Sequence, residues 1–394
     1  MIKNRDFIVF SDDWGRHPFS CQHIMKHFLP ENRIIWVNTI GMRKPRLSLY
    51  DIKRAAGKLW SWLKPDSVNK SWDDKNLTLT SPFMIPYNRI PLIRSFNQRS
   101  VNKKVIDIME QLEFRNPILI TSLPNATDYI GGFNEVIDIY YCVDEFSEWP
   151  GVDKNLSLEM EGELLKKVDF VVAVSDELKK NKRTEKGPTY LLTHGVDVTH
   201  FEKTSQAFYK GSNDVMKRIP NPIIGYFGLF DERTDQNIME TILNGHPEWS
   251  LVVIGRSVTS MSRLEKYKNF YHIDEIAYEE LPNYAAKIDV CIIPYLINTL
   301  TKNINPLKLK EYLATGKPVI STALPEAVKL REWIKIGTDE NDFVIKVEEW
   351  LKDNNNPEKQ IAAVRNEDWH NKTELFSSWI EEGLKRKACS QKCL

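Results

Sequence analysis

The sequence has 394 residues, more than one hydrophobic core usually supports, so we expect two domains of ordinary size. Lysine plus arginine number 54, as do aspartate plus glutamate, so net charge gives no reason to expect a nucleic-acid partner. The five cysteines are scattered, without a CxxC pair or a histidine at metal-ligand spacing. This usage favours a reduced cytoplasmic protein without structural zinc.

The sequence shows no sign of a leader or a membrane span. Its start, MIKNRDFIVFSDDW, reaches charged residues before any apolar run long enough for a signal peptide. No stretch approaches the roughly 20 apolar residues that cross a bilayer. We therefore expect a cytoplasmic protein, either soluble or peripheral on the inner face of the plasma membrane.

Short β-branched and aromatic runs alternate with longer amphipathic segments, which is typical of parallel sheets with crossover helices. The pattern predicts two doubly wound α/β sheets, one in each half of the chain. The predicted strands of the first half are residues 7–11, 33–38, 77–81, 118–122, 138–143, 170–175 and 189–194. Those of the second half are residues 223–228, 250–255, 269–273, 290–295 and 318–322.

A domain boundary is expected between the two sheets. Residues 198–221 lose the periodicity and collect lysine, serine, asparagine and proline. We place the first domain at residues 1–200 and the second at residues 201–366. Because ligands of open parallel sheets bind beyond the carboxyl ends of the strands, the residues that follow each predicted strand are the candidates for function.

The segment PLKLKEYLATGKPVIST, residues 306–322, predicts a short helix that runs into a strand. Asn305 suits an N-cap, Pro306 suits the first helical position, and Gly316 ends the helix after about three turns. Lys308 and Glu311 lie together beside the apolar face of this helix. The face expected to pack on the sheet consists of Leu309, Tyr312, Leu313 and Gly316.

Lys308 and Glu311 suit two parts of a nucleotide. A lysine in the first turn adds charge to the positive end of the helix dipole, which makes an anion site for phosphates. A carboxylate one turn later can accept hydrogen bonds from the two neighbouring hydroxyls of a ribose. An ordinary surface ion pair, worth a few tenths of a kcal/mol, is the alternative that the spacing leaves open.

Several stretches together resemble a known family. The run at 306–322, with IPNPIIGYFG, LVVIG and EELPNYAAKIDVCIIPY before it, resembles the nucleotide-sugar domain of GT-B glycosyltransferases. The likeness is greatest to the family 4-like enzymes that build bacterial teichuronic acid, capsule and other exopolysaccharides. YYCVDEFSEWPG, VDFVVAVSDEL, LLTHGVDVTHF and a final tryptophan-bearing helix follow the order of that family, so the resemblance covers most of the chain.

The resemblance implies a fold and a reaction class. The fold would be GT-B, with two Rossmann-like domains facing a cleft, and residues 367–394 would cross back as a helix to complete the first domain. The reaction would move a sugar from a nucleotide sugar, by family habit a UDP-sugar, to a hydroxyl of a glycan or lipid-linked acceptor, with no cofactor and no metal. The apolar stripe expected on the last helix is Leu375, Phe376, Trp379, Ile380 and Leu384.

The resemblance also assigns the donor site. Glu311 would hold the ribose, and Lys308 would neutralise the diphosphate and support catalysis. Gly228 would let the backbone approach the phosphates, and Pro306 and Leu307 would offer backbone groups beside the sugar.

Two departures from the family pattern concern phosphate and sugar contacts. Asn303 stands eight residues before Glu311, where many members carry a second glutamate. GLFDERTD replaces the usual Gly-Arg and Lys-Gly phosphate loop, which leaves Arg233 and Arg256 as substitutes. These departures leave open whether the anomeric configuration is retained or inverted.

Asn298 and Thr299 follow the strand VCIIPY and precede the donor helix, where sugar hydroxyls would be reached. A polar loop without a ligand is the alternative for both. His194 and Gly195 match the family's Asn-Gly-Val-Asp turn with histidine for asparagine. Gly195 would serve the turn geometry, and His194 would face the donor or hydrogen-bond within the linker.

In the first domain, Arg16 and His17 follow a predicted strand, at a position expected to face the cleft. The alternative is that they are polar residues of an ordinary loop without a functional role. Asp144 follows the strand DIYYCV and could act as general base on an acceptor hydroxyl. Its alternative role is to cap the next helix. Glu145 is the second candidate base, and the pair at residues 12–13 is too weak a signal for a metal site.

Residues 43–65 hold seven basic residues and one acidic residue, with apolar positions at helical spacing and two tryptophans. A basic amphipathic helix of this kind suits an anionic membrane surface. A helix packed on the sheet with a solvated basic face is the alternative. Two other functional classes also remain at this stage, namely a nucleotide-sugar epimerase on the same scaffold and a non-catalytic GT-B protein that binds sugar or a partner.

Overall fold

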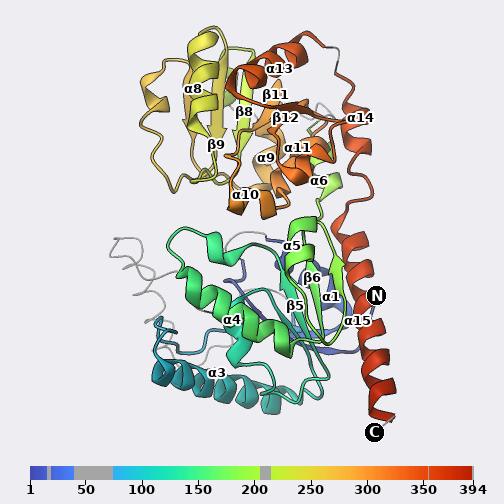
Figure 1. The fold of residues 1–394 in the computed structure, drawn as a ribbon. Helices are drawn as coiled ribbons and strands as arrows, with labels where there is room; N and C mark the ends of the chain where they lie inside the picture. The colour runs from blue at the N-terminus through green and yellow to red at the C-terminus, as the bar shows by residue number, and fades with distance from the viewer. Residues whose placement is uncertain (16–18, 40–73, 205–213, 354, 393–394) are drawn as a thin grey trace. The chain divides into compact units, whose positions relative to one another are not determined.

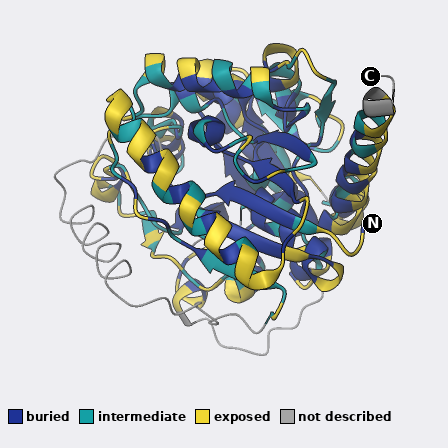
Figure 2. Ribbon diagram, turned by 90° about the horizontal axis from the view of Figure 1, so that it is seen from below, coloured by how far each residue is buried: buried dark blue, intermediate teal, exposed yellow. Residues whose placement is uncertain are grey.

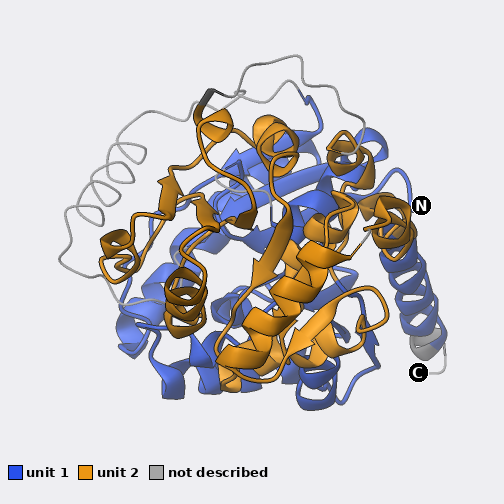
Figure 3. Cartoon of the chain, turned by 90° about the horizontal axis from the view of Figure 1, so that it is seen from above, with its two compact units in different colours: residues 1–193, 372–394 blue, residues 194–371 orange. Residues whose placement is uncertain are grey.

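The computed structural model describes residues 1–15, 19–39, 74–204, 214–353 and 355–392 (Figure 1). It divides the chain into two compact units (Figure 3). Unit 1 comprises Met1–Thr193 and Lys372–Leu394, and unit 2 comprises His194–Asn371. Arg16, His17 and the basic stretch 43–65 lie outside the described residues.

Unit 1 is built on a seven-stranded sheet in the order β3-β2-β1-β4-β5-β6-β7, with every described pair parallel. Its central strands are mostly apolar and almost entirely buried, whereas the helices keep exposed outer faces (Figure 2). The strands are β1 (Asp6–Ser11), β2 (Arg33–Asn38), β3 (Leu77–Thr80), β4 (Ile118–Thr121), β5 (Ile137–Cys142), β6 (Phe170–Ala173) and β7 (Thr189–Leu191). The helices are α1 (Ser20–Phe28), α3 (Pro91–Leu112), α4 (Lys154–Lys167), α5 (Asp176–Asn181) and α15 (Trp369–Lys392).

Unit 2 is built on a six-stranded parallel sheet in the order β10-β9-β8-β11-β12-β13. Its strands are β8 (Ile223–Phe227), β9 (Ser250–Ile254), β10 (Phe270–Ile273), β11 (Val290–Ile293), β12 (Val319–Thr322) and β13 (Lys335–Gly337). The helices are α6 (Val198–Glu202), α7 (Asp214–Lys217), α8 (Gln236–Gly245), α9 (Leu281–Ala285), α10 (Thr299–Asn303), α11 (Leu307–Ala314), α12 (Pro325–Val328), α13 (Glu340–Lys352) and α14 (Pro357–Ala362).

All the strands predicted from the sequence are present, and the two doubly wound sheets are confirmed. The edge strand β13 was not predicted, because three residues are too few to show a period. In each sheet the strand order reverses once, between β1 and β4 in unit 1 and between β8 and β11 in unit 2. Ligands of such sheets bind at these switch points.

The unit boundary lies at Thr193/His194, seven residues before the predicted position. The residues after His194 belong to unit 2 because they pack into it. Val196 pairs with Asp368, and the Phe201 ring lies 6.3 Å from Phe227 and 5.8 Å from Tyr278. The loss of periodicity that suggested the boundary therefore begins inside unit 2.

Most of α15 packs on unit 1, as expected for the last helix. Trp379 stacks on Tyr190 with ring centroids 4.4 Å apart, and Phe376 contacts Tyr141 at 5.6 Å. The predicted stripe was wrong at Leu375, which is 44% exposed. Gly383 lies in the buried face instead, because a Cβ there would be 2.5 Å from Ile137 Cδ1.

We expect Phe376→Ala to lower the free energy of unfolding by about 3 kcal/mol, because the ring is fully buried and its removal leaves a cavity. Leu375→Ala is the matched control on the same helix, and urea denaturation should show little change for it. Equal effects of the two substitutions would contradict the assigned helix face.

Candidate functional site

The candidate site forms where two loops meet at the switch point of unit 2. The loop after β8 and the loop after β11 are joined by a bridge between Thr234 and Tyr295. Leu296 N donates to Arg233 O at 2.7 Å, and Asp235 N donates to Pro294 O at 2.6 Å. The sheet topology and these hydrogen bonds hold both loops beyond the carboxyl ends of β8 and β11.

Two glycines bring backbone segments close together at this edge. Gly228 has φ +116° and directly follows β8, and Gly255 has φ +131° and directly follows β9. A Cβ on Gly255 would lie 2.5 Å from Gly228 O, and a Cβ on Gly228 would lie 2.2 Å from Lys308 Cε. Glycine is therefore needed at Gly228 both for its backbone conformation and for the space that the Lys308 side chain fills.

Lys308 reaches from α11 across Gly228 into the loop after β8. Its Nζ donates to Tyr226 Oη at 2.6 Å, to Leu229 O at 2.8 Å and to Tyr295 Oη at 3.2 Å. Nζ also lies 4.4 Å from the centroid of the Tyr226 ring. The three oxygens come from β8, from the loop after β8 and from the loop after β11, so the ammonium is fixed at the switch point.

The charges around Lys308 affect the two tyrosines differently. Burial would raise the pKa of Tyr295, but the positive charges of Lys308 and Arg233 outweigh it and lower that pKa. Burial raises the pKa of Tyr226. Sequence reasoning missed both tyrosines, although each stands at a strand end in GYFG and IIPY, where a site residue is expected.

Arg233 is held by Asp231 within the loop after β8. Arg233 Nε lies 2.9 Å from Asp231 Oδ1, and Nη2 lies 2.6 Å from Oδ2. Burial would raise the pKa of Asp231, but Arg233 and then Lys308 hold it below its ordinary range. The Arg233 guanidinium carbon lies 5.4 Å from the Tyr295 ring centroid, so this predicted substitute cation adjoins the Lys308 cluster.

Glu311 lies one turn after Lys308 and is partly exposed. Burial raises the pKa of Glu311 to about 7, and the nearby charge of Lys308 limits the rise. Within the described part of the chain, the Glu311 carboxylate has no hydrogen-bond or ion-pair partner. An acceptor held in this way can take hydroxyl donors from a ligand.

Tyr278 and His200 form an aromatic pair near Glu311. Their rings stack at 4.3 Å, and His200 Nε2 lies 3.0 Å from Tyr278 O. Burial, and next the charge of Glu311, raises the pKa of Tyr278, and burial lowers the pKa of His200. Sequence reasoning missed this pair because the two residues lie in α6 and before α9 with no shared pattern.

The start of α11 differs from its prediction. Pro306 occupies the N-cap position and Leu307 begins a helix of 8 residues, which is shorter than expected. Asn305 is not the cap, because Oδ1 accepts from His194 N at 3.1 Å and Nδ2 donates to Glu326 Oε2 at 3.2 Å. The predicted buried face, including Gly316 at φ +73°, is confirmed.

The His194–Gly195 turn is structural in this conformation. The His194 carbonyl accepts from Lys310, a buried lysine that also pairs with Glu367. Gly195 is required for packing and not for a left-handed turn, because a Cβ there would lie 2.6 Å from Trp369 Cδ2. The expectation of turn geometry was therefore wrong for Gly195.

Asn298 and Thr299, which were proposed to contact the sugar, stand at the amino end of α10, and Asn303 stands at its carboxyl end. Asn298 caps the helix, with Thr301 N donating to its Oδ1 at 3.0 Å, and Thr299 begins the helix and is exposed. Asn303 is buried and its Nδ2 donates to Thr299 O at 2.7 Å. Arg256 follows Gly255 and accepts a hydrogen bond on its carbonyl from Phe230 N at 3.0 Å.

In unit 1, Asp144 follows β5 and is half-buried. The residue whose side chain caps α4 is Asp153. Glu145 is buried and lies 2.7 Å from Lys182 Nζ, which also lies 2.6 Å from Glu161 Oε2. Of the two candidate bases, Glu145 is therefore already paired with Lys182, and the role of Asp144 as a base stays a prediction.

The described residues contain no group of three or more histidine, cysteine, aspartate and glutamate side chains that could hold a metal ion. Among the helices of those same residues, none is both long and apolar enough to span a bilayer.

The fold has known counterparts. The chain has a TM-score of 0.67 to the α,α-trehalose-phosphate synthase (UDP-forming) from Burkholderia vietnamiensis, with 11% identity, covering 97% of this chain and 100% of that one. Its TM-score to Anabaena Alr3699/HepE in complex with UDP is 0.65, with 13% identity over 95% of this chain and 100% of that one. The two parallel-sheet units therefore have the GT-B glycosyltransferase fold.

Sequence comparisons relate unit 2 and its candidate site to known glycosyltransferases. Residues 222–363, which carry the Lys308 cluster, match the family described as glycosyl transferases group 1. The chain is also 25% identical over 256 residues to the protein of Bacillus subtilis (strain 168) named "Putative teichuronic acid biosynthesis glycosyltransferase TuaH". That match covers 59% of this chain and 64% of the Bacillus protein. The resemblance to family 4-like GT-B glycosyltransferases is confirmed.

We expect Glu311→Gln to stabilise the unliganded protein at about pH 8 and to have little effect at about pH 4. Because burial raises the folded-state pKa of Glu311 from 4.5 to about 7, the parent protein loses stability as pH rises through this window. Denaturant unfolding at both pH values measures the difference. The exposed Glu279→Gln is the control, and an unchanged difference across the window would contradict the assignment.

Proposed function

We propose that the protein transfers a sugar from a nucleotide-sugar donor to an acceptor hydroxyl. A UDP-sugar is the proposed donor, and the proposed acceptor is a glycan or lipid-linked saccharide in bacterial cell-surface polysaccharide synthesis. The observation that carries the proposal is the Lys308 ammonium at the switch point of unit 2, with the Glu311 carboxylate one turn away and without a partner among the described residues. The group 1 family match over these residues supports it.

In this reaction the bond between the anomeric carbon and the diphosphate breaks, and the acceptor oxygen bonds to that carbon. Negative charge builds on the departing diphosphate. Lys308, the backbone near Gly228 and the amino end of α11 would stabilise that charge, which is commonly a large contribution to such catalysis. Pro306 and Leu307 stand at this helix end, where their backbone groups would lie beside the sugar.

The hydrogen bonds of Lys308 suggest how the diphosphate enters. An ammonium has three donors, and all three are used by Tyr226, Leu229 and Tyr295. The bond to Tyr295 is the longest at 3.2 Å, so it is the one that a phosphate oxygen would replace most readily. Tyr226 and Leu229 would keep the ammonium in position while it binds the donor.

Glu311 would accept hydrogen bonds from the ribose hydroxyls. Burial desolvates this carboxylate in part, and no described residue donates a hydrogen bond to it. A ligand with two adjacent hydroxyls would supply the missing donors. Arg233, Arg256, Asn298 and Thr299 are further candidates for phosphate and sugar contacts in the same unit.

On the acceptor side, Asp144 is the proposed general base that removes the proton from the acceptor hydroxyl. His17 is proposed as a further catalytic residue of the first domain. Residues 43–65 are proposed to bind an anionic membrane at the cytoplasmic face, where a lipid-linked acceptor would be presented. We propose no metal and no cofactor for this reaction.

Asn303 is the reason to consider two alternatives to a transferase, an epimerase and a binding protein. Many family members carry a glutamate at this position, whereas the Asn303 amide donates to the backbone of α10. A nucleotide-sugar epimerase would convert donor alone. A binding protein would convert nothing. Incubating the protein with a panel of nucleotide sugars, with and without bacterial lipid extract, separates these classes from a transferase, which consumes donor productively only with acceptor.

We expect Lys308→Ala to lower kcat/KM for the donor that this panel identifies by roughly 100-fold or more, because it removes a charge that stabilises the departing diphosphate. Lys302→Ala, an exposed lysine on α10, is the matched control and should retain parental turnover. Near-normal transfer by Lys308→Ala would show that the donor site is elsewhere.

We expect the parent protein to bind UDP about tenfold more tightly than 2′-deoxy-UDP, since a hydrogen bond to a charged group contributes about 1.5 kcal/mol or more. Glu311→Ala should bind the two nucleotides equally. Isothermal calorimetry on the four combinations gives the coupling directly. A preference for UDP that survives Glu311→Ala would remove the ribose contact from this residue.

A further inference from the structure

A group of large apolar side chains on unit 1 is exposed to solvent. They come from the segment after β3 and the first two turns of α3, and we call residues 83–96 the apolar platform. Their exposed fractions are 42% for Phe83, 55% for Tyr87, 46% for Ile90, 82% for Leu92 and 44% for Phe96. The Phe83 and Phe96 rings meet edge to face at 6.0 Å, so the two segments form one surface.

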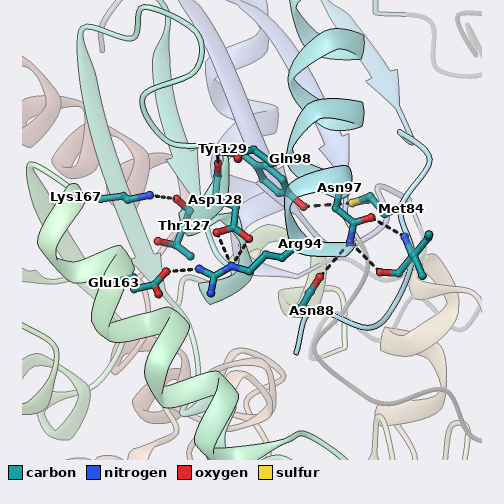
Figure 4. A network of polar contacts seen from close by, with 11 residues as sticks. Met84, Asn88, Arg94, Asn97, Gln98, Thr127, Asp128, Tyr129, Glu163 and Lys167 are labelled. Atoms are coloured by element: carbon teal, nitrogen blue, oxygen red, sulfur yellow. Dashed lines mark hydrogen bonds and ion pairs between the residues drawn. The ribbon is translucent and has the colours of Figure 1, made fainter. Parts of the chain in front are cut away.

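The platform is fixed from behind by the side chain of Asn97 (Figure 4). Asn97 Oδ1 accepts from Ile85 N at 2.8 Å, and Nδ2 donates to Ile85 O at 2.8 Å and to Asn88 Oδ1 at 3.2 Å. Ser100 Oγ donates to Phe83 O at 2.7 Å. The exposed rings therefore do not belong to a loosely attached loop.

Arg94 anchors the first turns of α3 to the rest of unit 1. Its Nε lies 2.7 Å from Asp128 Oδ2, at the end of the 3-10 helix η2 (Pro124–Asp128), and its Nη2 pairs with Glu163 on α4 (Figure 4). Both contacts are partly buried and bring two carboxylates to one guanidinium. These contacts anchor the first turns of α3 to unit 1 while Leu92 and Phe96 stay exposed.

The two faces of α3 differ sharply in composition. The inward face is buried and consists of Asn97, Val101, Val105 and Ile108. The outward face begins with Leu92 and Phe96 and continues at helical spacing with Arg99 and Lys103, all of which are exposed. The outward side of this helix is seen in Figure 2. An apolar surface therefore passes directly into a basic one.

The charged residues of the platform and of the next two turns of α3 are basic, and the exposed Asp107 and Glu110 follow further along the same helix. Residues 81–104 contain five basic residues and no acidic residue. Among the described residues, Asp153 lies 3.4 Å from Arg89, and Asp128 and Glu163 pair with Arg94. The basic side chains beyond the platform, Arg99 and Lys103, complement a negatively charged partner.

We propose that the apolar platform docks the protein on an anionic lipid bilayer. Phe83, Leu92 and Phe96 enter the boundary between headgroups and acyl chains, and Arg99 and Lys103 face the lipid phosphates. A second copy of this chain is a poorer partner, because a symmetric dimer through this surface would bring the basic side chains Arg99 and Lys103 of both copies close together. The inference rests on the proposed function in that a lipid-linked acceptor lies at the bilayer, and it adds a surface distinct from residues 43–65.

The test measures binding of the full-length protein to sedimenting vesicles of phosphatidylcholine with and without phosphatidylglycerol at low salt. We expect binding only to the anionic vesicles. The double variant Leu92→Glu with Phe96→Glu should lower the partition coefficient by about tenfold or more, because two large apolar side chains no longer enter the bilayer. Arg99→Gln with Lys103→Gln should weaken the binding and its salt dependence.

The control variant is Ile345→Glu, which changes an apolar side chain of unit 2 that is 51% exposed, and it should bind like the parent. Thermal stabilisation by UDP is measured for every variant, so that loss of fold or of the donor site is seen separately. Parental binding by the Leu92/Phe96 variant, absence of binding to anionic vesicles, or a dimer that this variant dissociates would each overturn the docking surface. If thermal stabilisation by UDP is unchanged in these cases, the docking surface is wrong but the proposed function is not contradicted.

Discussion

The hydrogen bonds of Lys308 join three segments of unit 2 that are far apart in the sequence. Its ammonium binds Tyr226 at the end of β8, Leu229 in the following loop and Tyr295 after β11. Because a partly buried ammonium needs hydrogen-bond acceptors, these contacts constrain both loops at once. They also require Gly228, since any Cβ there would meet the lysine side chain at 2.2 Å. The geometry of the whole candidate site depends on this one array.

Local features of this array were predictable, and its long-range partners were not. The strands follow from short β-branched runs, and the Lys308–Glu311 pair follows from their spacing of three on a helix. Tyr226 lies 82 residues from Lys308, so only the parallel sheet order places it there. Gly228 was expected for phosphate approach, whereas the structure shows that it also makes room for the lysine.

The asparagines of unit 2 show where sequence patterns cannot decide. Asn305 has the pattern of an N-cap but binds His194 and Glu326, whereas Asn298 was assigned to the sugar and caps α10. A short amide can satisfy a nearby helix end or a distant backbone group at similar free energy. Tertiary packing decides which of the two an asparagine binds. For Asn305, the buried Lys310 on α11 donates to the His194 carbonyl and so holds the His194 backbone close to Asn305.

The carboxylates of the two units differ in how far the fold satisfies them. In unit 1, Lys182 lies between Glu145 and Glu161, and Tyr140 donates a further hydrogen bond to Glu161 at 2.7 Å. Burial would lower the pKa of Lys182, but the charge of Glu161 and the hydrogen bonds of both glutamates raise it. Glu311 differs from these glutamates, because no described residue pairs with its carboxylate and burial raises its pKa to about 7. A group that the fold leaves desolvated is a cost to stability, and this cost falls when a ligand supplies the missing donors.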